Sequence, residues 1–117
     1  MMNDLEICKA IAEIEFGEKS DDWWYSEGIV SYLTSDLVGF FKQAKEYNPL
    51  TDDALCFQLM IKYSIDLIHE LKGPKYKHHR YVAKRELPNR VYEIVSTDLI
   101  SPNKAICLVI IEANKGK

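Results

Sequence analysis

The sequence predicts an α+β fold in which a small antiparallel β-sheet of three or four strands carries helices on both faces, an α-β-α sandwich. Segments whose apolar residues recur every three or four positions alternate with segments rich in aromatic and β-branched residues. Two of the latter are separated by the turn signal Leu87-Pro88-Asn89, which indicates antiparallel pairing. With 117 residues, 47% of them apolar and 28% charged, one core is expected, so residues 1–117 are predicted to form a single domain.

The N-terminal segment is predicted to form a helix and then extended structure. Residues 4–16 place apolar side chains at intervals of three and four, after an asparagine and an aspartate that can accept hydrogen bonds from free amides. Gly17 is a typical helix stop. Residues 23–33 are rich in aromatic and β-branched side chains, and Gly28 occupies a plausible turn, so a β-hairpin is one expected arrangement.

Two helices are expected in the middle of the chain. Ser35-Asp36 is a good helix start, and the residues after it place an apolar stripe opposite polar side chains. This helix is predicted to end before Pro49, because the residue before a proline disfavours helical conformation. Thr51 is predicted to cap the next helix, which extends to about Tyr63. The aspartates at positions 52 and 53 suit its first turn, which explains them better than a magnesium site does.

The C-terminal part is predicted to supply three strands and a last helix. Residues 64–68 alternate polar and apolar side chains, as in a half-buried strand. Two β-prone segments follow the break at Gly73-Pro74, at residues 76–84 and 90–96. Ser101-Pro102 is a capping residue followed by a proline at the first helical position, so residues 103–114 are predicted to be helical. A buried strand is the alternative there, because residues 105–111 are all apolar.

Two segments resemble a known family when they are taken together. These are YNPLTDDALCFQLMIKYSIDLI, residues 47–68, and SPNKAICLVIIEAN, residues 101–114. They are similar to the phage ABA sandwich domain, a family of small bacteriophage and prophage proteins, over about the last two thirds of the chain. The resemblance implies a phage origin and a sheet with helices on its two faces. It implies no catalytic residues.

The charges of the sequence are unevenly distributed. Residues 1–36 contain nine acidic and two basic residues, a net charge of −7, whereas residues 71–90 contain seven basic residues and one acidic residue, a net charge of +6. Such asymmetry is typical of a binding surface, or of two parts of one domain that attract each other.

The basic segment 72–90 suggests nucleic-acid binding as an alternative function. Lysine and arginine neutralise phosphates, and tyrosine rings stack on bases. A simpler explanation is favoured, in which the charges of an exposed hairpin prevent edge-to-edge pairing of sheets. The candidate nucleic-acid-binding residues are Lys75, Tyr76, Lys77, Arg80, Tyr81, Lys84 and Arg85.

A second candidate surface contains Trp23, Trp24 and Tyr25. Neighbouring residues of an extended segment point to opposite faces, so at least one tryptophan is expected to be partly exposed. Exposed aromatic side chains are common anchors of protein interfaces. These three residues are therefore the predicted partner-binding residues. The alternative is that Trp24 belongs to the core and Trp23 covers the edge of a helix.

No catalytic, metal-binding or cofactor-binding residues are predicted. The sequence has no GxSxG, P-loop, GxGxxG or HExxH motif. The adjacent histidines 78 and 79 would point to opposite faces of a strand, with no further ligand at a usual zinc spacing. The three cysteines, residues 8, 56 and 107, stand among aliphatic residues and are expected to be buried and reduced.

These observations lead to a functional hypothesis. The chain is expected to be a non-enzymatic phage or prophage accessory protein in the host cytoplasm that acts by binding a host or phage protein. Action against a host defence system is one concrete form of this role. Its acidic start is unlike a secretion signal, and its longest apolar run is far shorter than the ~20 residues of a membrane span. A homodimer is also considered, because a second copy could pair with the edges of a small sheet.

Overall fold

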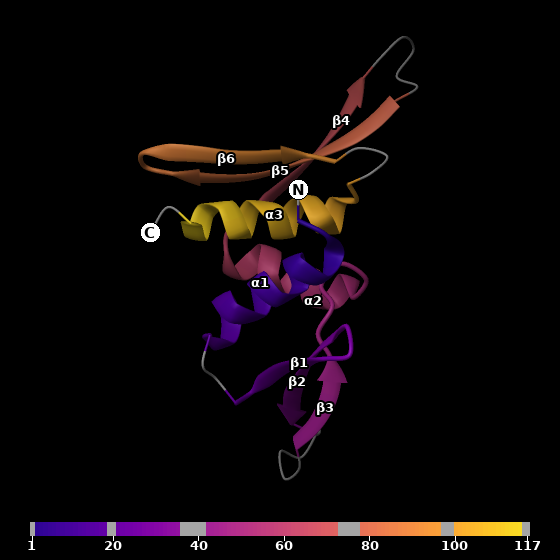
Figure 1. Cartoon of the computed structure of the whole chain (residues 1–117). Coiled ribbons are helices and arrows are strands. Elements are labelled where there is room, and N and C mark those ends of the chain that lie inside the picture. The colour runs from indigo at the N-terminus through magenta and orange to yellow at the C-terminus, as the bar shows by residue number, and fades with distance from the viewer. Residues whose placement is uncertain (1, 19–20, 36–41, 73–77, 97–99, 116–117) are drawn as a thin grey trace. The chain divides into compact units, whose positions relative to one another are not determined.

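The computed structural model describes residues 2–18, 21–35, 42–72, 78–96 and 100–115. These residues form three helices and two three-stranded antiparallel sheets, which confirms the predicted α+β class. The chain divides into two compact units, Met1–Asn48 and Pro49–Lys117, and each contains one of the sheets (Figure 1). The prediction that residues 1–117 form one domain stays a prediction.

The N-terminal unit consists of one helix and a sheet of order β1-β2-β3. Its elements are α1 (Asp4–Phe16), β1 (Trp23–Ser26), β2 (Ile29–Ser35) and β3 (Lys42–Glu46). The predicted first helix is confirmed, and the Asn3 side chain caps it by accepting a 2.8 Å hydrogen bond from the Glu6 amide. The buried stripe of α1 contains Ile7 and Ile11, and this helix packs against β1 and β2.

A tight turn joins β1 to β2 and confirms the hairpin predicted at Gly28. Ser26 pairs with Ile29, so only two residues form the loop. Both have positive φ angles, 53° at Glu27 and 79° at Gly28. Positive φ at both central positions is the geometry of a type I′ turn, whose twist matches that of the flanking strands.

The prediction of a helix that starts at Ser35-Asp36 is wrong for its C-terminal residues, 42–46. Residues 42–46 form β3, which pairs antiparallel with β2 from Ser35↔Lys42 to Ser31↔Glu46. Residues 36–41, which carry most of the expected apolar stripe, lie outside the described residues. The strand is favoured because it brings Tyr47 into the core, where its amide donates a 2.8 Å hydrogen bond to the Val30 carbonyl.

The C-terminal unit has the order helix, three strands, helix. Its elements are α2 (Asp53–Lys62), β4 (Asp66–Lys72), β5 (His78–Leu87), β6 (Arg90–Val95) and α3 (Pro102–Lys115). The strand order is β4-β5-β6, and α3 lies along β5 and β6 (Figure 1). The three predicted strands and the last helix are therefore confirmed, although the first strand begins at Asp66 and not at Ser64, and residues 76–77 of the second lie outside the described residues. The alternative of a buried strand at residues 105–111 is wrong, since these residues form the buried stretch of α3.

The first turn of α2 is capped by Asp52 and not by Thr51 as the sequence predicted. The Asp52 carboxylate accepts a 3.1 Å hydrogen bond from the Leu55 amide. The neighbouring Asp53 accepts a 2.8 Å hydrogen bond from the Asn103 side chain at the start of α3. Both aspartates thus hold helix ends in place, which agrees with the explanation preferred over a magnesium site.

Candidate functional site

The two tryptophans of β1 lie on opposite faces of the N-terminal sheet. Trp23 pairs with Tyr32 and Trp24 with Ser31, and paired residues share a face. The Trp23 indole is half-buried and donates a 2.8 Å hydrogen bond to the Gly17 carbonyl oxygen at the end of α1. Trp23 therefore has a structural role in joining the hairpin to the helix.

Three large side chains of the hairpin are exposed. Trp24 is 38% exposed, Tyr25 is 45% exposed and Ile29 is 47% exposed. Trp24 and Ile29 lie diagonally on one face of the sheet, and Tyr25 lies on the other face beneath the Lys9 ammonium, 4.6 Å from the ring centre. The prediction that at least one tryptophan is exposed is confirmed. We call Trp24, Tyr25 and Ile29 the hairpin surface.

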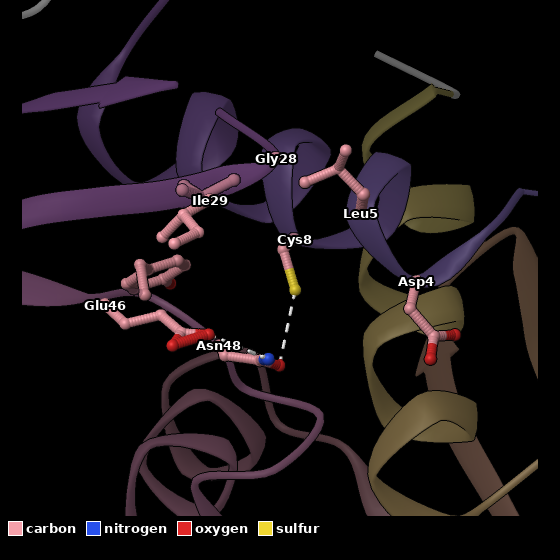
Figure 2. A pocket seen from close by; sticks show the side chains of 9 residues that line it. Asp4, Leu5, Cys8, Gly28, Ile29, Glu46 and Asn48 are labelled. Atoms are coloured by element: carbon pink, nitrogen blue, oxygen red, sulfur yellow. Dashed lines mark hydrogen bonds between the residues drawn. The ribbon is translucent and has the colours of Figure 1, made fainter. Parts of the chain in front are cut away.

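A shallow pocket lies beside the hairpin in the same unit. Its volume is about 250 Å³, and the Cys8 thiol inside it donates a 3.4 Å hydrogen bond to the Asn48 side-chain oxygen, whose amide donates to Glu46 at 3.4 Å (Figure 2). All three histidines of the chain lie between residues 69 and 79, so this unit supplies no imidazole base for the thiol. The lining residues are Asp4, Leu5, Cys8, Gly28, Ile29, Val30, Glu46, Tyr47 and Asn48.

The basic segment of the C-terminal unit is engaged in contacts within that unit wherever its side chains are described. Tyr81 stacks on His69 with ring centres 4.9 Å apart. Lys84 forms a 2.8 Å ion pair with Glu86, and the Arg85 guanidinium lies 5.8 Å from the Tyr63 ring. The structure therefore does not gather these three into one outward-facing cationic surface.

The remaining candidates of the basic segment are not placed by the structure. Lys75, Tyr76 and Lys77 lie outside the described residues, and Arg80 is described only as a backbone position of β5, paired with Glu70. The prediction that this segment binds nucleic acid stays a prediction.

The ion pair on β5 changes the titration of both partners. The hydrogen bond to Glu86, reinforced by its charge, raises the pKa of Lys84 above its ordinary value. The same hydrogen bond lowers the pKa of Glu86. Lys84 is therefore charged and paired with a carboxylate. It stands on β5, the central strand of the order β4-β5-β6, so the expectation that the charges of this segment protect a sheet edge is wrong for Lys84.

The cysteines and histidines offer no assembled reactive centre in the part of the chain that is described. All three cysteines are buried, and a hydrogen bond from Cys107 lowers the pKa of the Cys56 thiol, against its burial and the charge of Asp53. Among the described residues, no group of three or more His, Cys, Asp or Glu side chains is placed to hold a metal ion. The absence of cofactors and of catalysis stays a prediction.

An exposed apolar pair on α2 was not predicted from the sequence. Phe57 is 57% exposed and Ile61 is 62% exposed, and they lie one helical turn apart. The signal was present in their spacing of four residues, on a different side of the helix from the buried residues Cys56 and Leu59. This pair is a second place where an apolar surface is open to solvent.

Comparison with known proteins gives one distant similarity. The chain is similar to a Ribonuclease 3 of Acinetobacter baylyi, with 26% identity over 111 residues that cover 92% of this chain and 48% of the ribonuclease. The chain thus spans about half the length of the curated relative that it matches. No family model matches the sequence, and no solved structure matches it. The resemblance to the phage ABA sandwich domain stays a prediction.

Proposed function

We propose that the protein acts by binding another protein through the hairpin surface and catalyses no reaction. The observation that carries this proposal is the exposure of Trp24, Tyr25 and Ile29 on a short hairpin. Large aromatic side chains contribute most of the binding energy in many interfaces, because they bury a large area at a low cost in conformational entropy.

Charge favours a partner with a basic surface. Residues 1–48 contain ten acidic and four basic residues, a net charge of −6. Asp21 and Asp22 precede β1 and Glu27 stands in its turn, and all three are exposed. A basic partner would be attracted to the hairpin during diffusion, while acidic proteins would be repelled.

The biological setting of the proposal follows from the resemblance to phage proteins. In this setting the chain is an accessory protein of a phage or prophage, present in the host cytoplasm, and its target is a host or phage protein. Interference with a host defence system is one concrete form of this role. No helix among the described residues is long and apolar enough to cross a membrane.

The proposal is tested by capture of the partner from nuclease-treated host cells. Tagged wild-type protein is compared with Trp24→Ser, and with Phe57→Ser as the matched control for loss of an exposed aromatic side chain elsewhere. The proposal predicts a stoichiometric protein partner that survives nuclease, is retained by Phe57→Ser and is lost by Trp24→Ser. Equal capture by the wild type and Trp24→Ser contradicts it.

Nucleic-acid binding by the C-terminal unit is the second candidate function. Two observations favour it: residues 49–117 contain eleven basic and eight acidic residues, a net charge of +3, and the chain is similar to a protein whose name identifies it as a ribonuclease. Contacts to phosphates release counterions, so the affinity for RNA would fall steeply as salt rises. Fluorescence anisotropy of a labelled RNA across a salt series tests this candidate, and an affinity that does not change with salt contradicts it.

A further inference from the structure

The outer edge of β1 follows from the hydrogen-bond pattern of the hairpin. In an antiparallel pair, residues bonded to the partner strand alternate with residues whose backbone groups point away from it. The two-residue turn makes Ser26 and Ile29 a bonded pair, and the Leu33 amide donates a 2.9 Å hydrogen bond to the Asp22 carbonyl at the other end. Trp24 lies two residues from Asp22 and two from Ser26, so its backbone is hydrogen-bonded to β2 as well.

Trp23 and Tyr25 consequently direct their backbone N–H and C=O groups away from β2. β1 stands at the end of the strand order β1-β2-β3, so this side of the strand is a sheet edge. Within the described part of the chain, neither residue forms a backbone hydrogen bond outside the ladder. The edge thus presents two donors and two acceptors in the spacing that an added strand requires.

Exposed aromatic side chains stand on both faces of this edge. Trp24 is on one face and Tyr25 on the other, and a strand added to β1 would place its own side chains beside each ring. Neighbouring side chains on the same face of a sheet stabilise strand pairing, and aromatic rings pair well with β-branched residues. Both backbone and side chains of β1 therefore suit a β-strand ligand.

We infer that the edge of β1 binds an extended, basic segment of the partner protein as a fourth strand of the N-terminal sheet. This inference rests on the proposed function and identifies the kind of partner segment that the hairpin surface accepts. The expected ligand alternates β-branched residues with lysine or arginine. Its basic side chains lie near Asp21, Asp22 and Glu27, which flank β1 in the sequence.

Charge argues against a second copy of the chain at this edge. If β1 paired antiparallel with β1 of another molecule, Asp21 and Asp22 of each copy would approach Glu27 of the other. A parallel arrangement would bring identical carboxylates together. Like charges opposite each other destabilise strand pairing, whereas a basic strand meets opposite charges at both ends.

A peptide titration tests the inference on the whole chain without knowledge of the natural partner. The probe is the blocked pentapeptide Lys-Val-Lys-Val-Lys, added to ¹⁵N-labelled protein and followed by NMR. We expect the largest amide shifts at Trp23 and Tyr25. The lysine peptide N-methylated at its three central residues, which blocks both edges of the peptide strand, should bind at least roughly tenfold more weakly, because each lost hydrogen bond costs about that factor. Glu-Val-Glu-Val-Glu should also bind more weakly, because its charges are repelled by the acidic residues that flank β1. Equal binding of the N-methylated peptide, or no shift at β1 with millimolar peptide, overturns the inference.

A pair of variants at one position separates backbone pairing from loss of the ring. Tyr25→Ala and Tyr25→Pro both remove the aromatic side chain, but the proline also removes the outward amide, and an edge strand tolerates proline where its N–H faces solvent. We expect Tyr25→Pro to bind the lysine peptide roughly tenfold more weakly than Tyr25→Ala. Equal affinities of the two variants overturn the inference. If Tyr25→Pro disrupts the pairing of Trp24 with Ser31, the binding of the N-methylated peptide to the wild-type protein decides whether strand addition occurs.

The outcomes for this inference and for the proposed function are distinguishable. If Trp24→Ser loses the captured partner while the N-methylated peptide binds as well as the unmodified one, the function stands and strand addition fails. If Trp24→Ser captures the partner as the wild type does, the proposed function fails, whatever the peptide shows. Self-association of the free chain through Trp23 and Tyr25, seen by sedimentation and the same amide shifts, overturns the choice of a basic partner.

Discussion

Trp23 and Trp24 are neighbours in the sequence, but Trp23 is half-buried and bonded to the end of α1, whereas Trp24 is exposed. The Trp23 indole donates to the Gly17 carbonyl oxygen at 2.8 Å, whereas Trp24 is on the opposite face of the hairpin with Ile29. This relationship assigns a structural role to one ring and leaves the other available for a partner.

Alanine substitutions of the two tryptophans should separate these roles. Trp23→Ala is expected to lower the free energy of unfolding of the N-terminal unit by roughly 2 kcal/mol, because it removes half-buried apolar area and a hydrogen bond. Trp24→Ala is expected to cost about half as much, because its ring is more exposed. Urea unfolding followed by circular dichroism measures both, and a larger loss for Trp24→Ala would contradict the assignment.

Substitutions in the hairpin turn are expected to change the stability of the N-terminal unit in opposite directions at its two positions. Gly28→Ala is expected to destabilise the N-terminal unit by roughly 1 kcal/mol, because φ is +79° there and the added Cβ meets no atom within 4 Å, so strain is the whole effect. Glu27→Asn is expected to stabilise it by a few tenths of a kcal/mol, because asparagine tolerates positive φ in a type I′ turn. Thermal unfolding measures both, and two changes of the same sign would exclude this turn geometry.

The cap of α2 is tested by two substitutions at one residue. Asp52→Ala is expected to lower the free energy of unfolding of the C-terminal unit by about 1 kcal/mol, because the Leu55 amide loses its acceptor. Asp52→Asn retains a capping oxygen and is expected to remain within a few tenths of a kcal/mol of the wild type. Equal losses in the two variants would show that charge, and not the cap, is responsible.

The ion pair between Lys84 and Glu86 predicts a pH dependence on both sides of neutrality. Because the pKa of Glu86 is lowered, its contribution to stability is present above the ordinary glutamate pKa and is lost as pH falls through the folded pKa. Because the pKa of Lys84 is raised, its contribution is present below the ordinary lysine pKa and is lost as pH rises through the folded pKa. In Lys84→Met, the pKa of Glu86 measured by NMR titration should rise, and an unchanged pKa would contradict the pairing.

Loss of the Arg85 charge is not expected to destabilise the protein. Its Nε and Nη1 atoms are buried and have no hydrogen-bond partner among the described residues, while the guanidinium lies over the Tyr63 ring. Arg85→Met keeps the apolar stem and removes the unsatisfied donors, so it is expected to leave the free energy of unfolding unchanged or raise it by up to about 1 kcal/mol. A loss of more than about 2 kcal/mol in chemical denaturation would show that the guanidinium is well satisfied in solution.

The elements that the sequence predicted correctly are those with strong local signals. Asn3 and Gly17 bound α1, Gly28 lies in the hairpin turn, and Ser101 caps α3 by accepting a 3.1 Å hydrogen bond from the Lys104 amide. In each case a single residue satisfies backbone groups or adopts a conformation that few others adopt. Local chemistry was sufficient there.

The errors arise where distant contacts decide the structure. Residues 42–46, KQAKE, favour a helix locally, but pairing with β2 and burial of Tyr47 beside Phe16 and Tyr32 place them in a strand. The separate roles of Trp23 and Trp24 likewise depend on the register with β2 and on the end of α1. The exposure of Phe57 and Ile61 depends on which face of α2 meets α3, and periodicity alone does not fix that choice.

Site-specific photocrosslinking in host cells tests whether the hairpin surface contacts a protein partner. Trp24 is replaced by p-benzoylphenylalanine, with the same replacement at Phe57 as the control, and cross-linked products are treated with nuclease and identified by mass spectrometry. We expect one dominant nuclease-resistant protein adduct from position 24 that is absent from position 57. Adducts formed from position 57 alone, or products from position 24 that nuclease removes, would contradict the claim that the hairpin surface binds a protein.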